Sequence, residues 1–406
     1  MPKVSLGINV YEAALERIRF TFDNFDRIYL SFSGGKDSTA MLHLVMSEAI
    51  KRNRKIGLLV VDLEAQYKLT MDHIQDCINI YIESIDLYWI CLPLHLRNAV
   101  SVFEPFWLCW DDEKKKDWVR QIPKQSISDQ KYFPFFRKGM EFEEFVIEFG
   151  EWYSENKTTA CLVGIRADES LNRFRSIASK KKETLNGKQY TTKITNNIYN
   201  IYPIYDWRTE DIWIFHSKFK DKRHNELYDL MQKSGLSIHL QRICQPYGDD
   251  QRRGLYLFHL IEPETWAKVL VRVNGANSGA LYIQDSGNIN GYGKISKPNN
   301  HTWQSFSNMI LESMPLKTRN HYKNNISIYI SNWTNKDYNK GIPDEAPLIL
   351  ESKKIVPSYR KICKMLLRND WWGQELGMTP RKSEIYKKYL KEKYENSERL
   401  SFSVEK

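Results

Sequence analysis

The chain has 406 residues, of which 42% are hydrophobic and 27% are charged. This length allows two or three domains, and the composition is typical of a soluble globular protein. No apolar run approaches the ~20 residues that a membrane span needs, and residues 1–10 lack the apolar core of a signal peptide. We therefore expect a cytoplasmic protein with no membrane contact.

Charge and cysteine content narrow the function classes further. Residues 1–250 have 35 Lys and Arg against 35 Asp and Glu, whereas residues 251–406 have 25 against 15, so the net charge of +10 comes from the second part. A basic surface there suits nucleic acid or another polyanion, and a solvated helical face is the open alternative. None of the six cysteines forms a C-x-x-C pair, which argues against a disulfide framework, a zinc ribbon or an iron–sulfur cluster.

The first part of the chain predicts a strand, a glycine-containing turn and a helix. A helix over residues 9–25 precedes a short apolar strand at 27–30, and the apolar residues Met41, Leu42 and Val45 then recur at helical spacing. Such a turn directs backbone N–H groups and the positive end of a helix dipole at its ligand, so we expect an anion there.

The turn itself resembles the PP-loop, S-G-G-x-D-S-[ST], of ATP pyrophosphatases and sulfonucleotide reductases. The resemblance implies an open, mostly parallel α/β sheet with helices on both faces, the adenine nucleotide alpha hydrolase-like fold. It also implies an adenine nucleotide, either ATP or a PAPS/APS-type nucleotide, with Mg²⁺ held between its phosphates and Asp37. The residues implied to bind the nucleotide in the loop are Ser33, Gly34, Gly35, Lys36, Asp37, Ser38 and Thr39.

A second carboxylate follows the next predicted strand. The apolar run 56–61 ends at Asp62, and ligands of open α/β sheets bind at the carboxyl ends of strands. Asp62 and Glu64 are therefore candidate contacts for the ribose or a metal, and a turn or helix cap is the alternative for Asp62. A helix over 68–84 and a strand over 87–92 complete this pattern.

Residues 93–158 form an aromatic-rich insertion, which either contributes substrate specificity or forms a small aromatic core.

The segment from Gly164 to Arg173 resembles the G-[IL]-R-x-x-E-S-x-x-R element of sulfonucleotide reductases and related adenylyltransferases. It places Arg166 at the end of an apolar strand, where a guanidinium group can pair with phosphate. The resemblance implies that Gly164, Arg166 and Glu169 contact the nucleotide. Lys36, Asp37, Arg166 and Arg173 are the predicted catalytic residues. Glu169 has three open roles: a helix start, a metal contact, or a partner that orients an arginine.

Downstream, residues 203–213 resemble the family's P-[IL]-x-x-W-x-x-x-D-[IV]-W element, with Thr209 as the expected helix N-cap. Sulfonucleotide reductases end in a Glu-Cys-Gly-[IL]-His element whose cysteine attacks the sulfonyl sulfur, and this element does not occur in the present sequence. Cys244 and Cys363 are the remaining candidates for a reactive thiol, and a buried structural role is the alternative for both.

We predict a nucleotide-binding domain over 1–250 and a basic, mostly helical extension over 251–406. Helices are expected at 263–273, 302–314, 317–333, 357–370 and 379–397. This arrangement resembles a bacterial subgroup of PAPS-reductase-like proteins that includes the immunoglobulin-binding regulator A type. The resemblance implies a ParB-like or sulfiredoxin-like protein partner.

Three functions follow from these patterns. The first is an ATP pyrophosphatase or adenylyltransferase that activates an acceptor. The second is a sulfonucleotide reductase with a displaced cysteine. The third is a nucleotide-dependent regulator that acts with a nucleic-acid-binding partner or on nucleic acid itself.

Overall fold

The computed structural model describes residues 7–219, 223–243, 247–249, 255–276, 295–336, 338–379, 387 and 391. The chain divides into two compact units. The first unit comprises Met1–Leu96, Trp107–Pro246 and Gly254–Val273, and the second comprises Arg97–Phe106, Tyr247–Arg253 and Asn274–Lys406. Residues 254–273 thus pack with the first unit, and the domain boundary expected after residue 250 stays a prediction.

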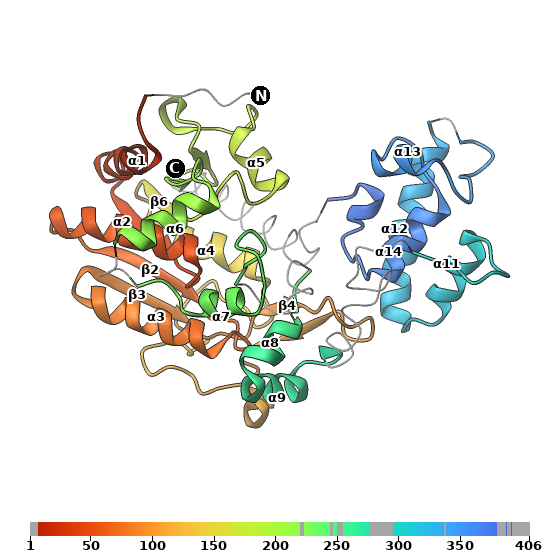
Figure 1. Ribbon diagram of the computed structural model, residues 1–406, viewed down its shortest axis with the longest axis horizontal. Coiled ribbons are helices and arrows are strands. Elements are labelled where there is room, and N and C mark those ends of the chain that lie inside the picture. The colour runs from red at the N-terminus through yellow and green to blue at the C-terminus, as the bar shows by residue number, and fades with distance from the viewer. Residues whose placement is uncertain are drawn as a thin grey trace, which may run out of the picture. The chain divides into compact units, whose positions relative to one another are not determined.

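A six-stranded, mostly parallel sheet forms the centre of the first unit (Figure 1). Its strand order is β3-β2-β1-β6-β8-β7, and the pair β7–β8 is antiparallel. The strands alternate with helices along the chain, as the sequence predicted, so the expected α/β fold is confirmed. The strands are β1 (Arg27–Ser31), β2 (Ile56–Val61), β3 (Ile85–Ile90), β6 (Thr159–Val163), β7 (Thr191–Lys193) and β8 (Ile198–Ile201).

The direction of the chain places helices on both faces of this sheet. The chain passes from β1 through α2 (Lys36–Lys51) to β2, and from β2 through α3 (Lys68–Tyr81) to β3, always in one direction. It then returns through α4 (Phe142–Ser154) to β6 on the other side of β1. Because such crossovers are right-handed, α2 and α3 cover one face and α4 covers the other. The order reverses between β1 and β6, which is where open α/β sheets bind ligands.

Aromatic packing attaches α4 to the sheet. The ring of Phe149 lies 5.3 Å from that of Tyr29 and 5.3 Å from that of Tyr88, centroid to centroid. Phe133, from the insertion, is buried against Trp152 with ring centroids 4.9 Å apart. Six of the fourteen Phe, Trp and Tyr rings of residues 93–158 are buried, and two are exposed, so the insertion contains a small aromatic core. The insertion also contains the paired strands β4 (His95–Arg97) and β5 (Phe106–Leu108).

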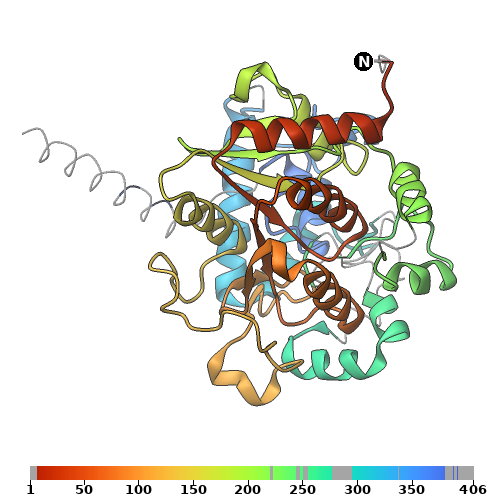
Figure 2. The same ribbon diagram turned by 90° about the vertical axis from the view of Figure 1, so that its left-hand side faces the viewer.

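Within the residues that the structure describes, the first unit has six further α-helices. Figure 2 shows α1 along one side of it, where Arg17 binds Asp206 at 2.7 Å. Two expected details were wrong. Strand β3 lies at 85–90 rather than 87–92, and Arg208 rather than Thr209 is the N-cap of α6, its backbone N–H bonded to Asp211. The helices are α1 (Val10–Asn24), α5 (Leu171–Ala178), α6 (Thr209–Lys218), α7 (Leu227–Lys233), α8 (Leu255–Ile261) and α9 (Pro263–Arg272).

The second unit is helical, as predicted, and has its own core around Tyr322, Ile362 and Met365. Buried Asn369 has a positive φ of 47° and donates to the carbonyls of Ala99 and Ser101 at 3.0 and 3.1 Å. The helix expected at 379–397 lies outside the described residues, apart from Thr379, Lys387 and Lys391. The described helices are α11 (Trp303–Glu312), α12 (Leu316–Thr334), α13 (Leu348–Ser352) and α14 (Tyr359–Leu367). No helix in the described part of the chain has the length and apolar content of a membrane span.

Candidate functional site

The predicted PP-loop joins β1 to α2 and requires glycine at its second position. Gly34 has a φ of +70°, and a Cβ there would lie 2.8 Å from Ile74 Cγ1. Gly35 is the N-cap of α2 and has no side chain to cap it, so the first N–H groups of the helix are available to other partners. The local structure is therefore the strand, turn and helix start that suit an anion.

The charged residues of the loop form one buried ionic cluster with the end of β6. Lys36 Nζ lies 3.3 Å from Asp37 Oδ2, and Arg166 Nε pairs with Asp37 Oδ1. Burial lowers the pKa of Lys36; Asp37 opposes this shift, and the positive charge of Arg166 adds to it. Asp37 thus holds two cations side by side, and three of the four predicted catalytic residues meet here.

The hydroxyl residues of the loop have different surroundings. Ser33 Oγ and Ser38 Oγ are 3.1 Å apart, and Ser38 Oγ also donates to the carbonyl of Gly35 at 3.0 Å. Thr39 is fully buried, with its hydroxyl 2.9 Å from His73 Nε2. Ser33 and Ser38 therefore belong to the loop's own hydrogen-bond network, whereas Thr39 attaches α2 to α3.

The element from Gly164 to Arg173 lies against the loop, as the sequence predicted. A Cβ on Gly164 would lie 3.1 Å from the Ser38 Cα, so glycine permits this close approach of β6 to α2. Glu169 accepts the Arg166 backbone N–H at 3.1 Å and pairs with Arg173. Of its three open roles, these contacts support the orienting one.

A cavity of about 290 Å³ lies beside this cluster. Lys36 and Arg166 line it from the loop and β6, and the start of α6 lines it with Arg208 and Thr209. The helix starts of α2 and α6 both add positive potential to this space. Arg173, with a side chain 42% exposed, is not among the lining residues. The remaining lining residues are Asp168, Glu169, Glu210, His239, Gln241 and Arg242.

Residues 225–242 supply site contacts that the motifs did not indicate. The Lys36 backbone N–H donates to the Tyr228 hydroxyl at 3.0 Å, and Lys36 Nζ donates to the Gln241 carbonyl at 3.1 Å. Asn225 Nδ2 donates to the Gly34 carbonyl at 3.0 Å. These residues come from α7 and its flanking segments, about 190 or more positions from the loop, so local sequence patterns carried no signal for them.

Asp62 has a different environment from the one expected for a ribose contact. Its carboxylate is fully buried, accepts from Trp89 Nε1 at 3.0 Å and pairs with Arg120. It also accepts the backbone N–H of Glu64 at 3.0 Å. These contacts correspond to the turn-forming alternative, and Asp62 is not among the residues lining the cavity at the loop.

Of the two candidate thiols, the structure describes Cys363 alone. Cys363 is fully buried, its Sγ donates to the Trp303 carbonyl at 3.0 Å, and burial raises its pKa to about 12. The basic helix therefore does not lower this pKa, and the alternative of a buried structural cysteine fits Cys363. Cys244 lies outside the described residues.

The side chains of the loop offer Mg²⁺ few free donor atoms. Asp37, the predicted ligand, already pairs with two cations, which disfavours a third positive charge at its oxygens. Within the described ranges, no three His, Cys, Asp or Glu side chains gather as a metal site. The residues in this arrangement do not fit a protein-held Mg²⁺ ion, so no step below uses one.

Two protein families match successive parts of this chain. Residues 27–234 match the phosphoadenosine phosphosulfate reductase domain, and residues 235–339 match a domain of unknown function, DUF3440. The uncharacterized protein YbdN of Escherichia coli K12 is 42% identical over 393 residues, which cover 95% of each chain.

Two solved structures match parts of this chain with lower sequence identity. The PAPS reductase of Candida auris is 15% identical, with a TM-score of 0.30, over 56% of this chain and 93% of that one. The FMN adenylyltransferase of Candida glabrata in complex with ATP is 17% identical, with a TM-score of 0.32, over 54% and 57%. On the extent of the domain match and of the likeness to YbdN, the chain belongs to the phosphoadenosine phosphosulfate reductase domain family.

Proposed function

We propose that this chain is a PP-loop enzyme that binds ATP or a related adenylyl nucleotide and activates an acceptor by adenylyl transfer. The observation that carries the proposal is the cavity at the point where the strand order reverses, which four Lys and Arg side chains line together with three Asp and Glu side chains. Lys36 and Arg166 line this cavity from the segments that follow the neighbouring strands β1 and β6, and Arg208 and Arg242 line it from later segments. Guanidinium and ammonium groups at helix starts are suited to phosphate oxygens.

In the proposed reaction, an acceptor oxygen attacks the α-phosphorus of ATP. The bond between this phosphorus and the bridging oxygen breaks, and pyrophosphate leaves with the electron pair. Negative charge develops on the phosphate oxygens, where Lys36 and Arg166 stabilise it. Asp37 positions both cations through its two carboxylate oxygens. Arg173 acts indirectly, because it contacts Glu169 and does not line the cavity.

ATP binding and pyrophosphate release test this proposal. Lys36→Ala removes one charge-assisted contact, which stabilises binding by about 1.5–3 kcal/mol, so ATP affinity measured by calorimetry should fall roughly 10-fold to 100-fold. Lys51→Ala is the matched control, because Lys51 is an exposed lysine at the other end of α2, and its affinity should equal that of the wild type. Failure of the wild type to bind ATP, or full pyrophosphate release by Asp37→Ala, contradicts the proposal.

A sulfonucleotide reductase is the second candidate, supported by the family to which the chain belongs. This reaction needs an accessible thiol, and the burial and raised pKa of Cys363 leave Cys244 as the candidate. Release of sulfite from PAPS with a thiol reductant, abolished by Cys244→Ser and kept by Cys363→Ser, would support it. A nucleic-acid or ParB-like partner stays a prediction, motivated by the charge of residues 251–406 and by the resemblance.

A further inference from the structure

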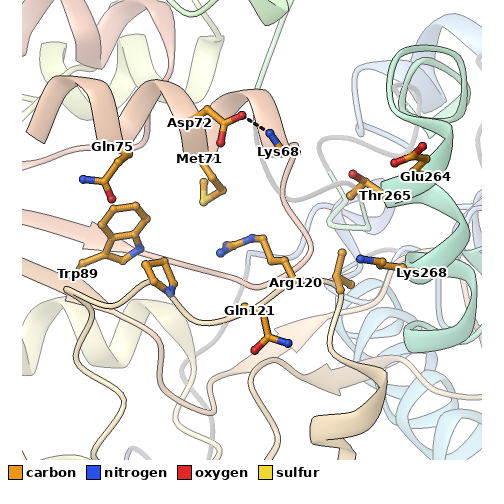
Figure 3. A pocket seen from close by; sticks show the side chains of 12 residues that line it. Lys68, Met71, Asp72, Gln75, Trp89, Arg120, Gln121, Glu264, Thr265 and Lys268 are labelled. Atoms are coloured by element: carbon orange, nitrogen blue, oxygen red, sulfur yellow. Dashed lines mark hydrogen bonds and ion pairs between the residues drawn. The ribbon is translucent and has the colours of Figure 1, made fainter. Parts of the chain in front are cut away.

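A second cavity, of about 470 Å³, lies in the first unit between α3, the end of β3, the insertion and α9 (Figure 3). It shares no lining residue with the cavity at the PP-loop. Its volume is within the range of small-molecule sites in proteins. The lining residues are Lys68, Met71, Asp72, Gln75, Trp89, Val119, Arg120, Gln121, Pro123, Glu264, Thr265 and Lys268.

Carboxylates outside the cavity fix its walls. Asp62 holds both Trp89 and Arg120 by its two oxygens. Glu262 accepts the first two backbone N–H groups of α3, from Lys68 at 2.8 Å and Leu69 at 3.0 Å, and so ties the start of α9 to α3. None of these anchoring carboxylates lines the cavity. The space is therefore a built feature of the fold rather than a gap between loops.

Buried Glu64 makes further contacts with two of these walls, the insertion and α9. It accepts the Val119 backbone N–H at 3.3 Å, next to Arg120, and pairs with Arg272 Nε at 2.8 Å at the end of α9. The wall formed by α9 lies in the region that matches the domain of unknown function, whereas the other walls lie in the reductase domain. The cavity thus exists only where both regions are present in one chain.

The side chains facing the cavity define the chemistry of an occupant. Figure 3 shows Trp89 and Met71 around the guanidinium end of Arg120, with Lys268 extending toward Arg120 from α9. An arginine has only donors, so a group beside it must accept hydrogen bonds. Trp89 and Met71 are buried and apolar, which suits a ring or a carbon chain.

Two carboxylates also face the cavity, and they limit its positive charge. Asp72 pairs with Lys68 at 2.6 Å on the exposed surface of α3, and Glu264 is exposed on α9. Both belong to the solvated rim, where charges are screened by water and salt. Arg120, with a side chain 17% exposed, is the cation that faces the inner part, and it also pairs with buried Asp62.

We propose that this cavity binds a small organic anion, with its acidic group at Arg120 and Lys268 and an apolar ring or chain against Trp89 and Met71. This site is independent of the nucleotide site and of the proposed adenylyl transfer. Its specificity comes from α9, which contributes Thr265 and Lys268.

The fluorescent probe 8-anilinonaphthalene-1-sulfonate, an aromatic anion, tests the site. We expect saturable binding to the full-length chain, with emission sensitised by tryptophan. Lys268→Ala should weaken binding about tenfold, since it removes one charge-assisted contact. Thr265→Phe should abolish binding by filling the space. Lys353→Ala, which removes an exposed lysine of the second unit, is the matched control and should bind the probe as the wild type does.

The neutral analogue N-phenyl-1-naphthylamine keeps the rings and lacks the sulfonate, so it separates charge from apolar contact. We expect it to bind at least tenfold more weakly than the anionic probe. The proposal is overturned if the two probes bind equally well. It is also overturned if the anionic probe gives no saturable signal, or if its binding is unchanged in both Thr265→Phe and Lys268→Ala.

Discussion

The hydroxyl of Tyr228 accepts a hydrogen bond from the first amide of α2, the Lys36 N–H. It also lies close to Gly35, where a Cβ would be 3.4 Å from the hydroxyl oxygen. Backbone N–H groups at a helix start are the groups that bind phosphate oxygens in nucleotide sites. Tyr228 therefore occupies an acceptor position that a phosphate oxygen could also take.

Replacement of this hydroxyl should have opposite effects on the free chain and on the nucleotide complex. Tyr228→Phe leaves the Lys36 N–H without its acceptor, which should lower the free energy of unfolding by about 1–3 kcal/mol. A phosphate oxygen can then satisfy this N–H directly. The rise in melting temperature that saturating ATP produces should therefore be larger in Tyr228→Phe than in the wild type, as measured by calorimetry.

Tyr329→Phe is a control for the loss of a buried tyrosine hydroxyl, because Tyr329 lies in the core of the second unit. Its ATP-induced shift should equal that of the wild type. An equal or smaller shift in Tyr228→Phe would contradict the assignment of the Tyr228 hydroxyl to the phosphate position.

At the scale of elements, α9 is attached to the end of β2 by a buried ion pair. Arg272 Nε lies 2.8 Å from Glu64 Oε1, and Arg272 Nη2 lies 3.1 Å from Glu64 Oε2. Burial raises the pKa of Glu64, and Arg272 opposes the shift. Glu64 also has a φ of 64°, in the left-handed region that favours glycine. The pair therefore maintains a backbone conformation that glutamate adopts only at a cost.

Loss of one partner of this ion pair should lower the free energy of unfolding. Arg272→Met leaves a buried carboxylate without its cation, so the free energy of unfolding in urea should fall by roughly 3–5 kcal/mol. The double variant Glu64→Gly with Arg272→Met should regain part of this loss, because no charge remains and glycine relieves the backbone strain. Lys68→Ala, which breaks an exposed pair with Asp72, should change stability by about 0.5 kcal/mol or less. A double variant less stable than Arg272→Met would contradict this account.

Local sequence patterns predicted most of the elements but not their long-range contacts. Strand β2 and helix α2 follow from apolar spacing, and the position of Arg166 follows from the end of an apolar strand. The shift of β3 by two residues arose because Ile85 begins the apolar run of that strand and Asp86 interrupts it. Helix α9 was expected, but its attachment to β2 depends on Glu64 and Arg272, which are 208 positions apart.

Local sequence patterns likewise predicted only part of the candidate site. The loop and Arg166 were predicted because their residue types match a short motif, and the structure brings them together. The association of Asp62 with the nucleotide assumed that a carboxylate at a strand end faces the ligand, whereas Trp89 and Arg120 bind it inside the protein. Tyr228 and Gln241 had no signal, because a single tyrosine or a backbone carbonyl forms no motif.

At the scale of the whole chain, buried ionisable groups make stability depend on pH in two directions. Burial lowers the pKa of His73 to about 3, with smaller contributions from His43, His216 and His224. Burial also raises the pKa of Glu141 to about 7, and Glu144 and Glu143 add to this shift. As the pH falls, His73 binds a proton more readily in the unfolded chain, which lowers the stability of the fold. Glu141 binds its proton more readily in the folded chain, which raises the stability.

The contribution of His73 has a definite sign and range. Its folded pKa is lower than the value of about 6.5 in the unfolded chain, so folding loses stability as the pH falls from about 6.5 toward 3. Between pH 7 and pH 5, this single group should cost roughly 2 kcal/mol. His73→Gln has no ring to titrate, so its free energy of unfolding should fall by about 2 kcal/mol less than that of the wild type over this interval.

The comparison of the wild type with His73→Gln isolates the contribution of His73 to the pH dependence, because Glu141 and all other titratable groups are present in both. Urea unfolding followed by tryptophan fluorescence at pH 7, 6 and 5 gives the two stability curves. His73→Gln loses the ring nitrogen that contacts Thr39, so it should be less stable than the wild type at pH 7, and the gap should narrow toward pH 5. Parallel curves would mean that His73 has the same pKa in the folded and unfolded chains, which would contradict the lowered pKa of the buried ring.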